Sequence, residues 1–368
     1  MAIETGIKPE DMNPNAASVD VAVPQTPNFE GGAEVMQNPQ GGAIVQAITQ
    51  AIAAQQEQEP QTPHDANLAE LIDEGYRGEL STELRGSYEE DLESRSEWEE
   101  TYTKGLDQLG IKHEERSQPF EGASGVTHPL IAESVTQFQA QAYKELLPAD
   151  GPVRTQVIGM KNPQTEQQAN RDKDFMNYLI MDQMKEYEPE FDSMLFHLPL
   201  AGSTFKKVYY DDLLGRAVSK FVPAEDLIVP YSATSLEDTE AVVHVIKMSG
   251  NELRKQQVAG FYRDVKLGEP PITENQLDEK KLQLEGISKD GQEDQYTLYE
   301  MHTNLDLPGY EDMDENGVPT GIKLPYVITF AEVNQTILSI RRNFKVDDPS
   351  KKKINYFVQF KFLPGTGF

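Results

Sequence analysis

The sequence predicts an α+β fold in which helices come first and a mostly antiparallel sheet follows. Between residues 66 and 201, apolar side chains recur at steps of three and four, which is the period of a helix. After Gly202, short runs of β-branched and aromatic residues are separated by turn residues, which is typical of strands. We therefore expect a helical region over 66–201 and a β-rich region with one inserted helix over 202–368.

Residues 1–65 differ in composition from both regions. Gly, Pro, Asn, Gln and Ala dominate there, and Phe29 is the only aromatic residue. Such a segment buries too little apolar surface to offset its ordering entropy, so we expect a disordered tail. An alternative stays open within it, because Ile44, Ile48 and Ile52 recur at helical spacing and favour a short helix that needs a partner.

The helical region divides into several expected helices. The first begins near Leu68 and continues to Leu109, where Gly110 is placed to end it. Within it, residues 71–100 hold eleven acidic residues, three arginines and only a thin apolar stripe, so we expect a solvated or inter-subunit helix. Further helices are expected over 130–147, 163–187 and 191–200, and a short strand over 153–160.

The β-rich region contains seven expected strands, at 204–210, 217–222, 242–248, 296–304, 326–330, 336–340 and 354–360. Residues 211–215 suit the turn between the first two, and 251–261 suit the inserted helix. The acidic segment 268–293 has weak helical content. The last residues, 357–368, are strongly apolar although chain ends are usually polar, so we expect a fragment that ends within a longer protein.

Charge and cysteine content exclude several classes of function. The formal net charge is −29, and a surface this acidic repels phosphate, which disfavours a protein that grips DNA but suits one that lets DNA slide past. The absence of cysteine excludes disulfides, thiolate zinc sites and cysteine nucleophiles. No apolar run is long enough to cross a bilayer and no secretory signal is visible, so we expect a soluble chain made in a cytoplasm, with no membrane anchor.

The best metal candidate is the segment from Asp312 to Gly317. Asp312, Asp314 and Asn316 place oxygen ligands at alternate positions before a glycine, as in the first half of a calcium-binding loop. The twelfth position of such a loop is a glutamate, but here it is Lys323, which places a cation at the metal. We therefore interpret the segment as an acidic hairpin turn.

Three other groups of residues fail as sites of chemistry. The loop Gly122–Gly125 lacks the following lysine of a phosphate-binding loop, so we expect a packing role. The cluster Lys351–Lys353 could touch DNA, but a loop between strands explains it better. The six histidines show no ligand spacing within one element: His64, His113, His128, His197, His244 and His302. We assign no catalytic, cofactor-binding or metal-binding residue, and we expect a structural protein rather than an enzyme.

Long strings of the sequence resemble one known family. Residues 119–148 (PFEGASGVTHPLIAESVTQFQAQAYKELLP) are similar to the early wing region of portal proteins of tailed bacteriophages. Residues 200–210 (LAGSTFKKVYY) and 221–230 (FVPAEDLIVP) resemble the same region, and 361–368 (KFLPGTGF) resembles the segment before a long helix in that family. The resemblance covers about 66–368 and is closest to the large portals of short-tailed phages.

The resemblance implies a homo-oligomeric, dodecameric ring at one vertex of the capsid in the virion, assembled in the host cytoplasm. Terminase pumps double-stranded DNA in through such a ring without reading its sequence, and the genome leaves through it at ejection. Capsid, scaffold and tail adaptor proteins would be further partners. The chain would be the wing, ending before the stem and clip. No catalytic residues or cofactors carry over from the family, because the ATPase belongs to the terminase.

Two alternatives remain at this point. One is another head-to-tail adaptor or assembly protein without catalysis, which a coding sequence beyond Phe368 lacking long helices would favour. The other is a calcium-dependent hydrolase that uses Asp312 and Asp314, which predicts loss of activity or stability on chelation.

Overall fold

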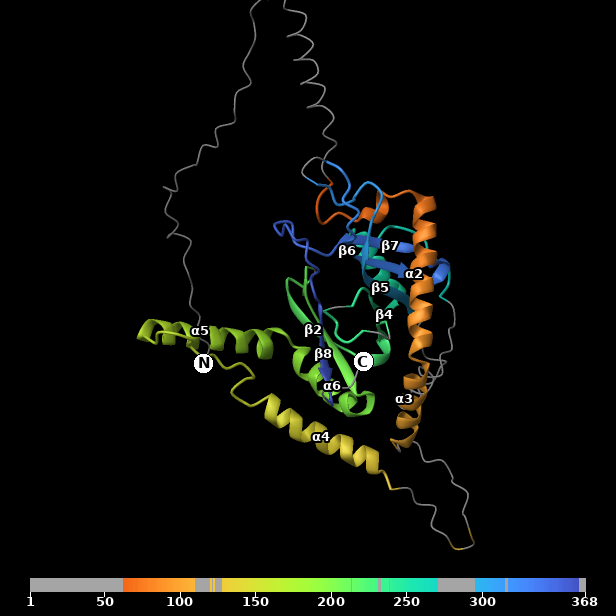
Figure 1. The fold of residues 1–368 in the computed structure, drawn as a ribbon. Helices are drawn as coiled ribbons and strands as arrows, with labels where there is room; N and C mark the ends of the chain where they lie inside the picture. Colours follow the sequence, from red (N-terminus) through yellow and green to blue (C-terminus); the bar gives the residue numbers. More distant parts are fainter. Residues whose placement is uncertain are drawn as a thin grey trace, which may run out of the picture. The chain divides into compact units, whose positions relative to one another are not determined.

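The computed structural model describes residues 62–109, 120, 122, 128–212, 214–230, 233–237, 239–270, 295–314 and 317–363, which form an α+β fold (Figure 1). The predicted tail, apart from 62–65, lies outside the described residues, as do the helix expected near Ile48 and most of 268–293. The helices are η2 (Leu68–Glu70), α2 (Glu74–Ser94), α3 (Ser96–Gln108), α4 (Leu130–Leu146), α5 (Pro163–Tyr178), the π-helical turn η3 (Leu179–Gln183), α6 (Tyr187–Ala201), η4 (Ala224–Asp226), α7 (Gly250–Val258) and η6 (Val333–Gln335).

The strands form two antiparallel sheets rather than the single sheet we expected. They are β1 (Ser203–Asp211), β2 (Arg216–Val222), β3 (Leu227–Ile228), β4 (Val242–Ser249), β5 (Gln295–Leu305), β6 (Leu324–Ala331), β7 (Ile337–Arg342) and β8 (Phe357–Lys361). One sheet has the order β2-β1-β8 and the other β3-β4-β5-β6-β7. The expected α+β fold with antiparallel strands is confirmed, but its division into two sheets was not foreseen, because the last strand returns to pair with β1, a long-range pairing that local patterns do not reveal.

The five-stranded sheet is covered on both faces. Tyr299 and Met301 of β5 pack with Leu80 and Leu84 of α2 in one buried cluster. Their neighbour Leu298 belongs to a second cluster, which includes Leu253 of α7. Because successive side chains of a strand point to opposite faces, α2 and α7 lie on opposite faces of the sheet.

The three-stranded sheet packs against α6, and α4 packs on α6 in turn. Met194 and Leu195 of α6 are buried with Leu147, while Phe138 and Phe221 pack at the edge of that cluster. Gly202 connects α6 directly to β1 with φ of +80°, a left-handed conformation that favours glycine. This short connection fixes the helix on its own sheet.

The acidic helix expected from Leu68 to Leu109 is interrupted at Arg95, between α2 and α3. The Arg95 guanidinium donates to the backbone carbonyls of Ala224, Glu225 and Leu227 at 3.1, 2.6 and 3.2 Å. These bonds tie the helix break to the segment before β3. The apolar stripe of α2 is used for packing on the sheet, so this helix is not solvated on all sides.

Two expectations for 153–187 were wrong. Residues 153–160 form no strand, because no neighbouring strand is there to complete a ladder. The helix expected to reach residue 187 changes to the π-helical turn η3 at Leu179 and ends before Met184. Pro189 lies in the gap between the helices expected over 163–187 and 191–200, but in the structure it is in the first turn of α6, where a proline is tolerated.

The described fold begins on the edge of β7. Asn67 places its side-chain oxygen 3.0 Å from the Ile340 backbone nitrogen, and its side-chain nitrogen 3.0 Å from the Leu338 carbonyl oxygen. Arg342 donates to the carbonyls of Pro63 and His64, so these residues belong to the fold although they were assigned to the tail. The segment satisfies the edge of β7, which would otherwise present unpaired backbone groups.

Replacing Asn67 with alanine is expected to lower the free energy of unfolding by about 2–3 kcal/mol, because the buried Ile340 N–H and Leu338 C=O lose their partner. Urea denaturation monitored by the single tryptophan, Trp98, measures the change. Asn170→Ala on the exposed surface of α5 is the matched control and should change stability by less than about 0.5 kcal/mol. Equal effects of the two substitutions would contradict the assignment.

Candidate functional site

Among the described residues, several ionisable side chains meet in a buried charge cluster between the two sheets. Glu300 of β5 receives two hydrogen bonds from Lys207 of β1, at 2.6 and 2.8 Å, and contacts His302 Nε2 at 2.8 Å. His244 of β4 lies opposite Glu300 in the sheet register. The side chains of Lys207, Glu300 and His302 are at most 14% exposed. The ion pair between Lys207 and Glu300 therefore connects the two sheets, and it lies in surroundings of low dielectric constant.

Burial controls the protonation of this cluster. Although burial opposes its charged form, the Lys207 ammonium and His302 lower the pKa of Glu300 well below its usual value, so the carboxylate stays ionised. Burial lowers the pKa of His244 to about 3, and the positive charge of Lys207 acts in the same direction. Burial also lowers the pKa of His302. At neutral pH the cluster is one ion pair with two neutral histidines.

The geometry of the cluster favours a structural role. The cleft beside His302, lined also by Leu236, Lys353 and Tyr356, has a volume of about 10 Å³. That space is on the scale of one water molecule. In the described part of the chain, no three His, Asp or Glu side chains are grouped so that they could hold a metal ion. We interpret the cluster as the connection between the sheets.

Sequence reasoning missed this cluster, although one signal for it exists. Glu300 and His302 are two residues apart in a strand and therefore share a face, and two polar residues on the inner face of an apolar strand indicate a buried partner. The partner Lys207 lies 93 residues away, in another sheet. No local spacing predicts that contact.

A second buried cation, Lys206, lies on the opposite face of β1. Its Nζ atom is 3.9 Å from the centre of the Tyr187 ring and 5.0 Å from that of Phe191, both in α6. The residue is 3% exposed, and its Nζ forms no hydrogen bond with the described residues. Burial lowers the pKa of Lys206 to about 8, while Glu190 and Glu186 oppose that shift.

Replacing Lys206 with methionine is expected to stabilise the protein by about 1 kcal/mol at pH 7, because it removes a buried charge that the aromatic rings compensate only in part. The gain should shrink above pH 8, where the folded protein releases the Lys206 proton before the unfolded chain does. Urea denaturation at pH 7 and pH 9.5 tests both points. Lys323→Met, at an exposed position just before β6, is the control, and a stability loss with Lys206→Met at pH 7 would contradict the interpretation.

The calcium-loop candidate is an acidic hairpin turn in the structure, as we interpreted it. Asp312 forms an ion pair with Lys351 and accepts a hydrogen bond from Thr320 at 2.7 Å. Asp314 accepts a hydrogen bond from the Val318 backbone at 2.9 Å. Asn316 lies outside the described residues. The carboxylates are thus used to close the turn.

The other singled-out groups are dispersed. In the lysine cluster, Lys351 pairs with Asp312 and Lys353 donates to the Thr239 carbonyl at 3.0 Å, so both serve the loop between β7 and β8. Of the Gly122–Gly125 loop only Gly122 is described, and His113 is outside the described residues. Among the histidines, His244 and His302 alone meet in the buried charge cluster, from neighbouring strands.

Two exposed surfaces of the described residues lie outside the core clusters. The first, the acidic face, comprises Glu79, Glu83, Glu90 and Glu93 of α2, which are all exposed. Their spacing of four, seven and three places them on one side of the helix, away from the stripe that packs on the sheet. The whole segment from Glu74 to Gln108 holds eleven acidic and four basic residues.

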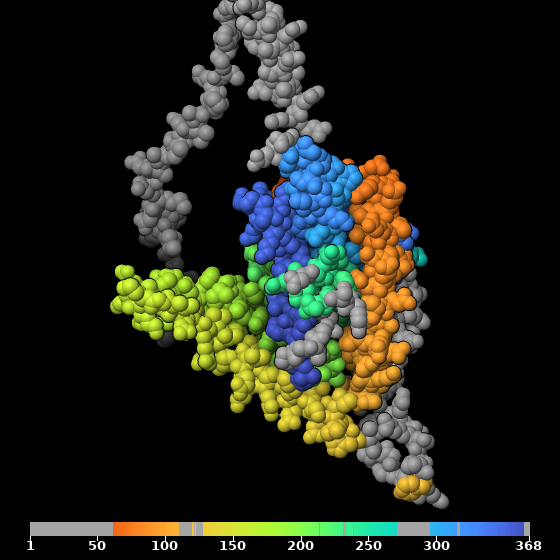
Figure 2. All heavy atoms as spheres, in the orientation of Figure 1, coloured from red at the N-terminus to blue at the C-terminus, as the bar shows by residue number. Residues whose placement is uncertain are grey.

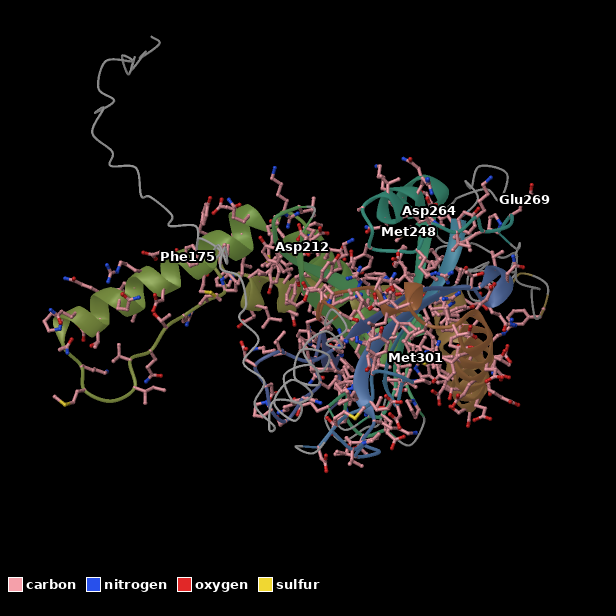
Figure 3. The ribbon with its side chains drawn as sticks, turned by 90° about the horizontal axis from the view of Figure 1, so that it is seen from above. Phe175, Asp212, Met248, Asp264, Glu269 and Met301 are labelled. Carbon is pink, nitrogen blue, oxygen red and sulfur yellow. The ribbon has the colours of Figure 1, made fainter. Side chains whose placement is uncertain are left out.

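The second surface is the arm, residues 152–184, which consists of an extended segment, α5 and η3. Figure 3 shows α5, with Phe175 labelled, reaching away from the sheets. Asn177 holds the extended segment on the helix, accepting from the Val153 backbone at 2.9 Å. In the fully described stretch 152–190 no residue is buried. The exposed apolar side chains of the arm are Ile158, Met160, Phe175, Met176, Tyr178 and Met181.

A scan against models of protein families finds no match, and a search of curated proteins finds none. None of the helices in the described ranges combines the length and apolar character that a membrane crossing requires.

Proposed function

We propose that the chain is a structural subunit of a portal ring of a tailed bacteriophage. In this role the ring lies at the capsid vertex of the virion, terminase packages double-stranded DNA through it, and the genome leaves through it toward the tail. Scaffold or coat proteins and tail adaptors are the further partners. The chain contributes the wing of the subunit and no catalysis.

The observation that carries the proposal is that the four strings resembling portal proteins meet in one module. Phe138 of the string 119–148 contacts Phe362 of the string 361–368, with ring centres 5.2 Å apart. Phe221 of the string 221–230 packs on the same apolar cluster as Phe138. The Phe362 backbone N–H donates to the Gly202 carbonyl at 2.9 Å, which joins the strings 361–368 and 200–210. Residues as far apart in the sequence as Phe138 and Phe362 thus support one another as a unit, which chance similarity of separate strings would not require.

The charge of the chain supports the same proposal. A net charge of −29 repels phosphate, so DNA can pass such a surface in either direction without being held. Three cations make contacts inside the fold instead of lying at the surface, which leaves the surface more acidic: Lys207, Lys206 and Arg95.

Electron microscopy and analytical ultracentrifugation of the purified full-length protein test the proposal. We expect closed rings with a central channel. A protein that stays monomeric at high concentration and in procapsid extracts would contradict it. A protein that stays monomeric alone but binds to preassembled portal rings would instead favour the adaptor function.

A further inference from the structure

We propose that the arm of one copy lies on the acidic face of α2 in the next copy. This inference rests on the proposed ring, and it names the two surfaces through which neighbouring subunits meet. The donor surface is residues 152–184, and the acceptor is the side of α2 that carries Glu79 and Glu83.

Among the described residues, the arm packs against no element that buries any of its side chains. A helix of 16 residues that buries no side chain has little more to stabilise it than local hydrogen bonds, and isolated helices of about 12–15 residues are marginal in water. The capping box formed by Asn162 and Thr165 defines where α5 begins but adds no tertiary contact. Methionine and aromatic side chains, which the arm exposes, are enriched at protein interfaces.

The arm is less acidic than the chain as a whole. Residues 152–184 hold four basic and four acidic residues and are formally neutral, in a chain with a net charge of −29. In the extended segment, Arg154 and Lys161 flank the apolar side chains of Ile158 and Met160, which are 95% and 90% exposed. Neither cation forms an ion pair with the described residues. A surface with this pattern fits an acidic partner with a small apolar recess.

The N-terminal half of α2 offers such a surface. Short residues lie beside Glu79 and Glu83, and among the described residues a shallow hollow there is lined by Gly75, Gly78, Glu79, Thr82 and Glu83. The hollow can receive Ile158 or Met160, while Glu79 and Glu83 face Arg154 and Lys161. Opposite charges at the edge of an interface select the partner and its register.

The placement of the two surfaces suits a ring. Within residues 62–363, Figures 1 and 3 show α5 and α2 on opposite sides of the sheets, and the space-filling view in Figure 2 shows the same separation. A contact between two different surfaces is head-to-tail, and repeating it closes a ring when the rotation between copies permits. From that position the arm cannot contact the acidic face of α2 in its own chain.

Cysteine cross-linking tests the contact, since the natural chain has no cysteine. Met160→Cys and Gly78→Cys are both suited to this, because Met160 is 90% exposed and a Cβ atom at Gly78 meets no atom within 4 Å. Full-length chains that carry both substitutions should form a ladder of covalent multimers on oxidation. A mixture of the two single variants should form covalent dimers only, which excludes a link within one chain.

The control pair is Val258→Cys with Gly78→Cys, since Val258 is 74% exposed on α7 and lies outside the proposed contact. If the wild-type protein forms rings but the Met160–Gly78 pair cross-links no more than this control, the arm contact is wrong and the ring survives. If the wild-type protein is monomeric, both proposals are wrong. The two failures are thus distinguishable.

Charge reversal provides the second measurement. Arg154→Glu with Lys161→Glu should raise the apparent dissociation constant between copies by about tenfold or more, because like charges then meet across the contact. Adding Glu79→Lys and Glu83→Lys to the same chain should restore assembly. Lys255→Glu with Lys266→Glu on the exposed surface makes the same change in net charge and should leave assembly intact. Equal loss in both double variants would overturn the proposed contact.

Discussion

Replacing Lys207 with methionine is expected to lower the free energy of unfolding by about 3–5 kcal/mol, the usual result of removing one partner of a buried ion pair. Glu300 is then left ionised between the sheets with only His302 as a hydrogen-bond partner. Methionine has a similar length and leaves little cavity, so the loss is electrostatic. Urea denaturation at pH 7 followed by Trp98 fluorescence measures it.

The double variant Lys207→Met with Glu300→Gln separates charge from packing. Glutamine keeps an oxygen that can accept a hydrogen bond from His302 but carries no charge, so more than half of the lost stability should return. Lys323→Met, at an exposed position just before β6, should change stability by less than about 0.5 kcal/mol. A loss below about 1 kcal/mol for Lys207→Met, or no recovery in the double variant, would contradict the buried pair.

The same pair shows which parts of this fold local patterns predict. The alternation in β5 and the helical spacing in α4 depend on neighbours a few residues away, and these elements lie close to their expected positions. The pairing of β8 with β1 and the contact of Lys207 with Glu300 join distant parts of the chain. Such contacts depend on topology, so the division into two sheets was not predictable from periodicity.

The wrong expectations for residues 153–160 and for the acidic helix have other causes. Val153 and Val157 favour a strand by composition, but a strand needs a neighbour, and residues 153–160 have none. The acidic helix was expected to be solvated or between subunits. In the structure α2 has two distinct faces: one packs on the sheet and the other, acidic face is exposed. The helix break at Arg95 is held by hydrogen bonds from its guanidinium to carbonyls more than 120 residues away. No capping motif near residue 95 predicts such a break.

A second large effect is expected on acidification: the protein should lose stability as the pH falls from about 7 to 5. An unfolded histidine has a pKa of about 6.5, whereas the pKa of His244 in the folded protein is about 3. Between these values the unfolded chain binds a proton that the folded protein does not, so the stabilisation is complete above about pH 6.5 and is lost as the pH falls. At pH 5, His244 alone accounts for about 2 kcal/mol. His302, whose pKa burial also lowers, acts in the same direction.

The sign of this pH dependence distinguishes it from the effect of the overall net charge on stability. The chain carries a net charge of −29, so protonation reduces repulsion between its carboxylates and by itself stabilises the compact state on acidification. The groups that face His244 are Lys207, Glu300, His302 and Lys220. Because Glu300 stays ionised well below its usual pKa, it does not titrate between pH 7 and 5 and leaves the slope to the histidines.

His244→Leu should therefore flatten the dependence of unfolding free energy on pH, whereas His128→Leu at the exposed start of α4 matches the change in composition and should not. Urea denaturation at half-unit pH steps decides the matter, since equal slopes for wild type and His244→Leu would show that folding does not change the pKa of His244.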